Sequence, residues 1–170
     1  MLSYLSGRMG YGEFVSESGE WAARLLILSL AVTPLRLIFK RGRWLVWLVR
    51  QRRYFGVATF GYATGHLAVY VLRKASPALM LEEASEPWLL AGWVAFVVLL
   101  ALAVTSNDAS VRLMRRGWKR LHRLVYLGAV LVFLHWTLSA FDPTVAYVHL
   151  AILVALETVR VALEIRQRVT

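Results

Sequence analysis

Long apolar runs alternate with short polar segments along most of the chain. A helix needs about 20 mostly apolar residues to span a bilayer. Five runs meet or approach that length, at 21–39, 54–73, 88–105, 121–141 and 144–162. The pattern therefore predicts an all-α integral membrane protein with five transmembrane helices. Between the last two runs, Pro143 favours a break and Asp142 can cap the following helix.

Composition supports the membrane class, because 59% of the 170 residues are hydrophobic, which is too many for a soluble domain of this size. Three regions follow from the pattern. We expect a periplasmic N-terminal segment at 1–19, a transmembrane domain at 20–165 and a cytoplasmic tail at 166–170.

The distribution of charge predicts the orientation. Loop 40–53 has six basic residues and no acid, and loop 106–120 has five basic residues and one acid. The segments 1–20 and 74–87 each have one basic residue and three acids. Because basic loops stay in the cytoplasm, we expect the N-terminus outside and the C-terminus inside a bacterial inner membrane, after five crossings. The net charge of +10 then reflects topology and contact with membrane lipid rather than nucleic acid.

Four histidines lie in or at the edges of the apolar runs, where ionisable residues are expensive and usually functional. His66 and His135 each lie about 9–10 Å below the outer edge, on helices that run in the same direction. His122 lies about 19–20 Å further in than His135, and His149 is again near the outer level. Any one of them alone could be an ordinary packing contact.

Two imidazoles at one depth on different helices suit the axial positions of a haem iron. His66 and His135 are the predicted pair, and His122 is a predicted ligand or edge residue of a second haem, a flavin or a quinone. His149 is a possible alternative ligand, and with it an intramembrane zinc site stays open. The chain has no cysteine, which excludes thiolate haem ligation and cysteine-ligated iron–sulfur clusters.

Other residues could support such cofactors. Arg36, Arg53 and Arg123 are possible contacts for haem propionates or a flavin phosphate, with lipid headgroups and topology as the alternative reading. Gly61 and Gly65 form a small-xxx-small pair that would let a backbone or a flat ligand approach closely.

Several stretches also carry a family resemblance. "TPLR" (33–36), "RRYFGVATFGYATGHLAVY" (52–70) and "GWKRLHRLVYLGAVLVFLHW" (117–136) resemble the MsrQ (YedZ) family of haem-binding membrane subunits. That family is part of the wider ferric-reductase-like transmembrane family. The resemblance spans roughly 20–140. The MsrQ pattern has one further helix before the first one here, and it has no counterpart of His149.

The resemblance implies haem b, one or two per chain, with His66, His122 and His135 as ligands of the haem iron, and FMN as a further cofactor. It implies electron transfer from a quinone or a cytoplasmic flavin to a periplasmic acceptor, such as a molybdopterin-containing methionine-sulfoxide reductase. The chain would then be an electron-transfer subunit rather than a complete enzyme. The alternatives are a stand-alone cytochrome b acting on quinone with superoxide, oxygen or ferric iron, and a non-redox membrane protein.

Overall fold

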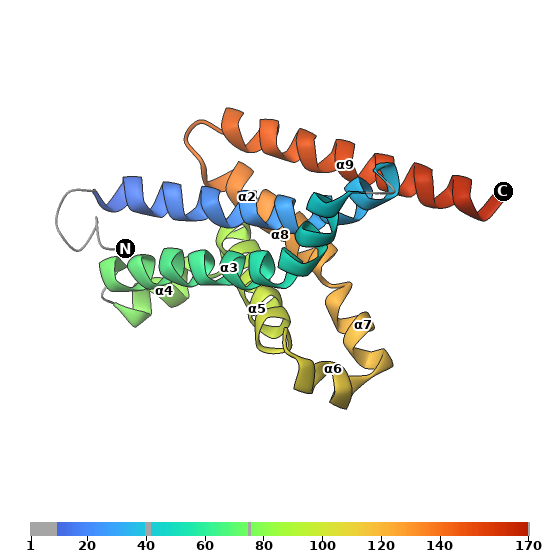
Figure 1. Cartoon of the computed structure of the whole chain (residues 1–170). Helices are drawn as coiled ribbons and strands as arrows, with labels where there is room; N and C mark the ends of the chain where they lie inside the picture. The colour runs from blue at the N-terminus through green and yellow to red at the C-terminus, as the bar shows by residue number, and fades with distance from the viewer. Residues whose placement is uncertain (1–9, 40–41, 75, 170) are drawn as a thin grey trace.

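The computed structural model describes residues 10–39, 42–74 and 76–169, and these form helices without a strand (Figure 1). The helices are α2 (Tyr11–Ile38), α3 (Arg43–Lys74), α4 (Pro77–Glu83), α5 (Pro87–Val104), α6 (Asp108–Met114), α7 (Arg116–His122), α8 (Val125–Ser139) and α9 (Thr144–Val169). The all-α prediction is confirmed for this part of the chain.

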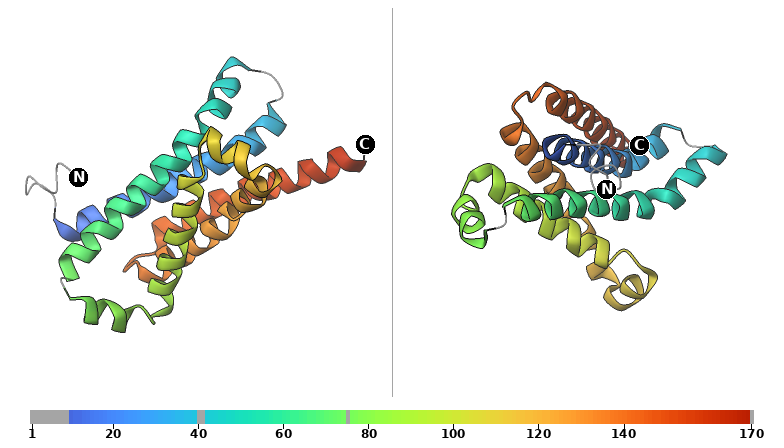
Figure 2. Two further views of the ribbon diagram at one scale, coloured as in Figure 1. Left: turned by 90° about the horizontal axis from the view of Figure 1, so that it is seen from below. Right: turned by 90° about the vertical axis from the view of Figure 1, so that its left-hand side faces the viewer.

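The central helix of the bundle is α2, which contacts α3, α8 and α9. Helix α5 packs against α8 and also touches α3, so that the α5–α8 pair crosses the α2–α3 pair (Figure 2). Helix α9 runs along the other side of α2. Because helices α2, α3, α5 and α8 converge, side chains of four separate segments meet in one place.

Small residues explain why α2 can be so well buried. Ala22, Ala23 and Ala31 are each at most 7% exposed, and small side chains let neighbouring helices approach closely in a membrane. Larger side chains fill the space between them. The core cluster joins α2 to α8 and α9 through Ala23, Leu26, Ile27, Leu30, Ala129, Phe133 and Leu153.

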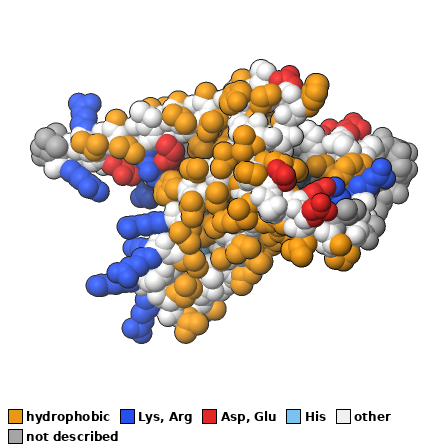
Figure 3. Space-filling model, turned by 180° about the vertical axis from the view of Figure 1, so that it is seen from behind, with side chains coloured by type: hydrophobic (Ala, Val, Ile, Leu, Met, Phe, Trp, Pro, Cys, Tyr) orange, Lys and Arg blue, Asp and Glu red, His pale blue; other side chains and the backbone are white. Residues whose placement is uncertain are grey.

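The outer surface suits a bilayer. Large apolar side chains such as Val97, Val104 and Val130 are more than half exposed, as expected where lipid rather than water covers them. In Figure 3, Lys and Arg side chains project from one end, and an apolar surface covers the middle. Within the residues that the structure describes, four segments are long and apolar enough to cross a membrane: α2, α3, α5 and the stretch Arg116–Ser139. Helix α9, the fifth predicted span, is not among these four.

The helix boundaries differ from those predicted. Helix α2 begins at Tyr11 rather than 21, and the Glu13 carboxylate accepts a hydrogen bond from the Gly10 N–H at its start. Thus residues 11–19, expected in the surface segment 1–19, belong to the helix, while 1–9 lie outside the described residues. Helix α3 begins at Arg43 rather than 54, and α9 extends to Val169, so the expected tail is mostly helical.

The fourth predicted helix, 121–141, is two helices. Helix α7 ends at His122 and α8 begins at Val125, with i→i+3 hydrogen bonds across the turn. The third helix lies within one residue of the prediction, and the Asp142 carboxylate accepts a hydrogen bond from the Thr144 N–H at 2.9 Å, as a capping residue should.

We expect Phe133→Ala to destabilise the bundle more than its neighbour Leu134→Ala, because Phe133 is 2% exposed and Leu134 is 44% exposed. We expect Phe133→Ala to lower the free energy of unfolding by about 3 kcal/mol, the lower end of the range for Phe→Ala in soluble cores. The lower end applies because lipid is as apolar as the protein interior, so exposing the Phe133 side chain to lipid costs little. Unfolding of both variants in micelles measures it. Equal stability of the two would contradict this packing.

Candidate functional site

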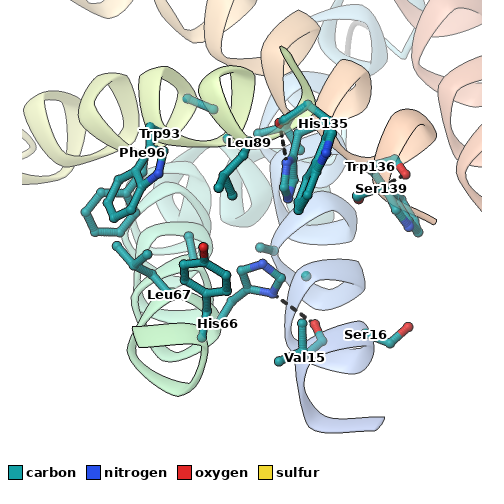
Figure 4. A pocket seen from close by; sticks show the side chains of 18 of the residues that line it. Val15, Ser16, His66, Leu67, Leu89, Trp93, Phe96, His135, Trp136 and Ser139 are labelled. Carbon is teal, nitrogen blue, oxygen red and sulfur yellow. Dashed lines mark hydrogen bonds between the residues drawn. The ribbon is translucent and has the colours of Figure 1, made fainter. Parts of the chain in front are cut away.

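His66 of α3 and His135 of α8 meet in the interior of the bundle. Their ring centroids are 6.1 Å apart, and the ring planes are perpendicular at 90°. Both rings project into one cavity of about 790 Å³, lined by residues of α2, α3, α5 and α8 (Figure 4). The structure therefore brings together the two histidines that depth alone had paired.

Each imidazole is fixed by one hydrogen bond to a helix backbone. The Nδ1 of His66 lies 2.9 Å from the carbonyl oxygen of Val15 in α2. The Nδ1 of His135 lies 2.8 Å from the carbonyl oxygen of Trp88 in α5. A carbonyl oxygen only accepts, so Nδ1 must carry the hydrogen in both rings. Each Nε2 then keeps a free lone pair, which is the form that binds a metal.

The cavity walls are mostly apolar, with a polar outer rim. Leu67, Leu89, Phe96, Leu99 and Val132 line the interior. At the rim, the Tyr70 hydroxyl and the Lys74 ammonium both donate hydrogen bonds to the Glu83 carboxylate. The space suits a flat, mainly apolar ligand.

One donor in the wall lacks a partner. Trp93 lines the cavity, and its Nε1 is buried without a hydrogen-bond acceptor among the described residues. An unpaired buried N–H is costly, and an acceptor on a bound group would satisfy it.

A three-ligand metal site is not assembled in the part of the chain that the structure describes, where no three His, Asp or Glu side chains group together. The zinc alternative needed His149 as third ligand, and His149 does not line the cavity. The donor set available here is two imidazoles, which suits a cofactor that brings its own equatorial ligands.

Sequence comparisons identify the family. The profile of the ferric reductase-like transmembrane component matches residues 18–134. The chain belongs to this family. His66 and His122 lie within the matched region, and His135 follows it directly.

Curated relatives in this family are haem-binding subunits MsrQ of protein-methionine-sulfoxide reductases. The protein of Ralstonia nicotianae is 45% identical over 129 residues, covering 73% of this chain and 58% of the relative. Those of Xanthomonas axonopodis pv. citri and Rhizobium meliloti are both 39% identical, over 134 and 130 residues, covering 76% and 75% of this chain and 60% and 58% of the relatives. The chain thus spans about three-fifths of the length of these ferric-reductase-like relatives. No solved structure matches the chain.

His122 lies apart from the cavity of this ferric-reductase-like domain. Its ring stacks on Trp118 with centroids 3.9 Å apart, and its Nε2 lies 3.0 Å from the Thr105 hydroxyl at the end of α5. The same hydroxyl lies 2.7 Å from the Ala101 carbonyl. His122 is therefore held by a side-chain hydroxyl, whereas each histidine of the cavity pair is held by a backbone carbonyl.

His149 has partners at both ring nitrogens. Nε2 accepts a hydrogen bond from Arg24 Nε at 3.3 Å, and Nδ1 lies 2.8 Å from the Val145 carbonyl in its own helix. Its ring lies against Trp136, with centroids 5.4 Å apart. Its free lone pair is thus already in use, which makes it a poor alternative ligand.

The three arginines named as possible phosphate or propionate contacts do not line the cavity. Arg36 and Arg123 are exposed. Arg53 pairs with Asp108 at 2.7 Å, and this hydrogen bond holds the pKa of the Asp108 carboxyl below its usual range. Their predicted role as phosphate or propionate contacts therefore does not apply to this cavity.

The ion pair at the rim of the cavity should make the stability of α4 depend on pH. The hydrogen bond from Lys74 is the main cause that holds the pKa of Glu83 below its usual value. A carboxyl whose pKa is lower in the folded than in the unfolded state stabilises the fold at pH values above its unfolded pKa. That stabilisation is lost as the pH falls through the folded pKa. We therefore expect the hydrogen-exchange protection of α4, corrected for intrinsic rates, to fall as the pH drops from the unfolded pKa of Glu83 through its folded pKa.

The matched variant is Glu83→Gln, in which α4 should be less protected at neutral pH and insensitive to acid. A pH profile of Glu83→Gln identical to that of the unmodified chain would show that this ion pair does not hold α4.

Proposed function

We propose that this chain is a haem b membrane subunit that carries electrons across the bacterial inner membrane to a periplasmic acceptor. The observation that carries the proposal is the pair of imidazoles in one cavity. Their ring centroids are 6.1 Å apart, and each Nε2 has a free lone pair. Two imidazole–metal bonds of about 2 Å each, together with the two ring radii, add up to about 6 Å. His66 and His135 would hold the iron.

The cavity supports the same choice. Its apolar walls fit a macrocycle, and the unpaired Trp93 N–H could satisfy a carboxylate at the edge of the group. When bound, haem supplies one-electron redox chemistry. The chain's part is to fix the two ligands, exclude water from them and provide a low-dielectric wall around them.

The proposed orientation in the membrane rests on the distribution of charge. The basic loops 40–53 and 106–120 would face the cytoplasm, and the cavity rim with Glu83 and Glu86 would face the periplasm. We propose α9 as a fifth crossing that returns the C-terminus to the cytoplasm. Its Arg160 pairs with Glu157 at 3.0 Å and also donates to the Tyr126 hydroxyl, which reduces the cost of placing these charges near lipid.

Electrons would enter from the basic end, from a quinone or a cytoplasmic flavin. His122 is the proposed ligand or edge residue of a second cofactor there, with Arg36 and Arg123 as contacts for the single phosphate of FMN, and with Arg53 as a further contact if it exchanges its Asp108 partner for that phosphate. The curated relatives are named as subunits of protein-methionine-sulfoxide reductases, and we propose a periplasmic reductase of that kind as the acceptor.

A reduced-minus-oxidised visible spectrum of the purified chain, with haem counted per chain, tests the proposal. His66→Ala and His135→Ala should each abolish the low-spin signal of the outer haem. His149→Ala is the matched control, and it should keep that signal because its nitrogens are engaged elsewhere. A colourless unmodified chain from haem-replete cells, or a normal spectrum in either cavity variant, would overturn it.

Orientation can be tested with single cysteines, because the chain has none of its own. We expect a membrane-impermeant thiol reagent to label Ser85→Cys in intact spheroplasts, and to label Ala109→Cys and Gln167→Cys only after permeabilisation. Labelling of Gln167→Cys from outside would contradict the fifth crossing, and labelling of Ala109→Cys from outside would contradict the whole orientation.

A further inference from the structure

Both cavity histidines rest on a neighbouring helix in the same way. His66 donates to the carbonyl of Val15, and His135 donates to the carbonyl of Trp88. In each case the residue four positions further along the accepting helix is a glycine, Gly19 after Val15 and Gly92 after Trp88. We call each combination of carbonyl and glycine a seat.

The glycines make room for the rings at these seats. A Cβ added at Gly92 would lie 2.8 Å from Nδ1 of His135 and 3.0 Å from its Cε1. At Gly19 it would lie 3.3 Å from Nδ1 of His66 and 3.4 Å from its Cε1. Residues i and i+4 share a helix face, so a side chain at either position would press against the ring that the carbonyl holds.

The seats explain how the two lone pairs come to share a cavity. Each carbonyl fixes the tautomer of its ring, because it accepts a hydrogen bond from Nδ1–H and leaves the lone pair on Nε2. A hydrogen bond from Nδ1–H also makes Nε2 a stronger electron donor to a bound metal. Stronger donation favours the oxidised metal and lowers its reduction potential.

We propose that Gly19 and Gly92 are positioning residues for the axial ligands, which set the coordination and the reduction potential of the outer haem. This inference rests on the proposed function. The Gly92 seat is the stricter of the two, because its Cβ distance leaves no room for an alanine unless the ring moves. The Gly19 seat needs the ring to yield by only a few tenths of an ångström.

The alternative is that the two glycines only allow close helix packing, and a third glycine provides a matched control for it. Gly128 of α8 faces Val98 of α5, where an added Cβ would lie 3.2 Å from the Val98 Cγ1. Gly128→Ala therefore crowds the same helix pair as Gly92→Ala, about as tightly as Gly19→Ala crowds His66, without touching a histidine.

The experiment compares the unmodified haem-loaded protein with Gly92→Ala, Gly19→Ala and Gly128→Ala. The measurements are haem affinity, the spin state of the ferric form and the midpoint potential of the outer haem. We expect Gly92→Ala to lose about 10–100-fold in haem affinity, as for lost outer-shell partners of metal ligands, and to become partly high-spin. Gly19→Ala should keep its haem with a raised potential, and Gly128→Ala should match the unmodified protein in spin state and potential.

The inference is overturned if Gly19→Ala and Gly92→Ala match Gly128→Ala in spin state and potential. If Gly92→Ala does not accumulate as folded protein, Gly19→Ala decides, and an unshifted potential there overturns it. Failure of the proposed function is a separate result, because it appears as an unmodified protein that binds no haem. A low-spin haem in the unmodified protein with insensitive glycine variants defeats this inference alone.

Discussion

Two hydrogen bonds from imidazoles to helix carbonyls determine whether the histidines of this bundle can act together as metal ligands. Each bond joins two helices, α3 to α2 through His66 and α8 to α5 through His135. Lipid is as apolar as the helix surfaces, so packing and such interhelical bonds must replace the hydrophobic effect in holding helices together. The same bonds direct the Nε2 lone pairs into the cavity. Helix association and site formation therefore depend on the same contacts.

The remaining architecture serves this arrangement. The small residues of α2 let four helices converge, and α9 covers the side of α2 that faces away from α3. The inner histidine is organised differently, because His122 bonds to a side-chain hydroxyl and stacks on Trp118. The chain thus carries one rigid imidazole pair near its acidic end and one separate imidazole near its basic end. Such a layout suits the stepwise movement of charge between two surfaces.

The sequence was most informative about the depth of each histidine in the membrane and least informative about the rotation of each helix about its own axis. Counting residues in two apolar runs was enough to place His66 and His135 at one level, because helical rise is constant. Hydropathy could not find the true starts of α2 and α3, since helices continue into polar surroundings at Tyr11 and Arg43. The break after His122 has no proline or glycine to mark it. Among the described residues no other helix backbone approaches Gly61 or Gly65, since a Cβ added at Gly61 meets nothing within 4 Å and one added at Gly65 meets only the Phe14 ring at 3.9 Å; the close approach of a flat ligand stays a prediction. The sequence shows where the glycines lie along each helix, but only the rotation of the helices in the structure shows that Gly19 and Gly92 face the histidine rings.

The proposed function requires that His66 and His135 together hold one metal. The most direct test is the electron paramagnetic resonance spectrum of the ferric, haem-loaded protein, with and without ¹⁵N-labelled histidine. We predict a low-spin signal with nitrogen couplings from two histidine imidazoles, and we expect that signal to be lost in His66→Ala and in His135→Ala. A high-spin signal from the outer haem, or couplings from a single imidazole in the unmodified protein, would contradict the account.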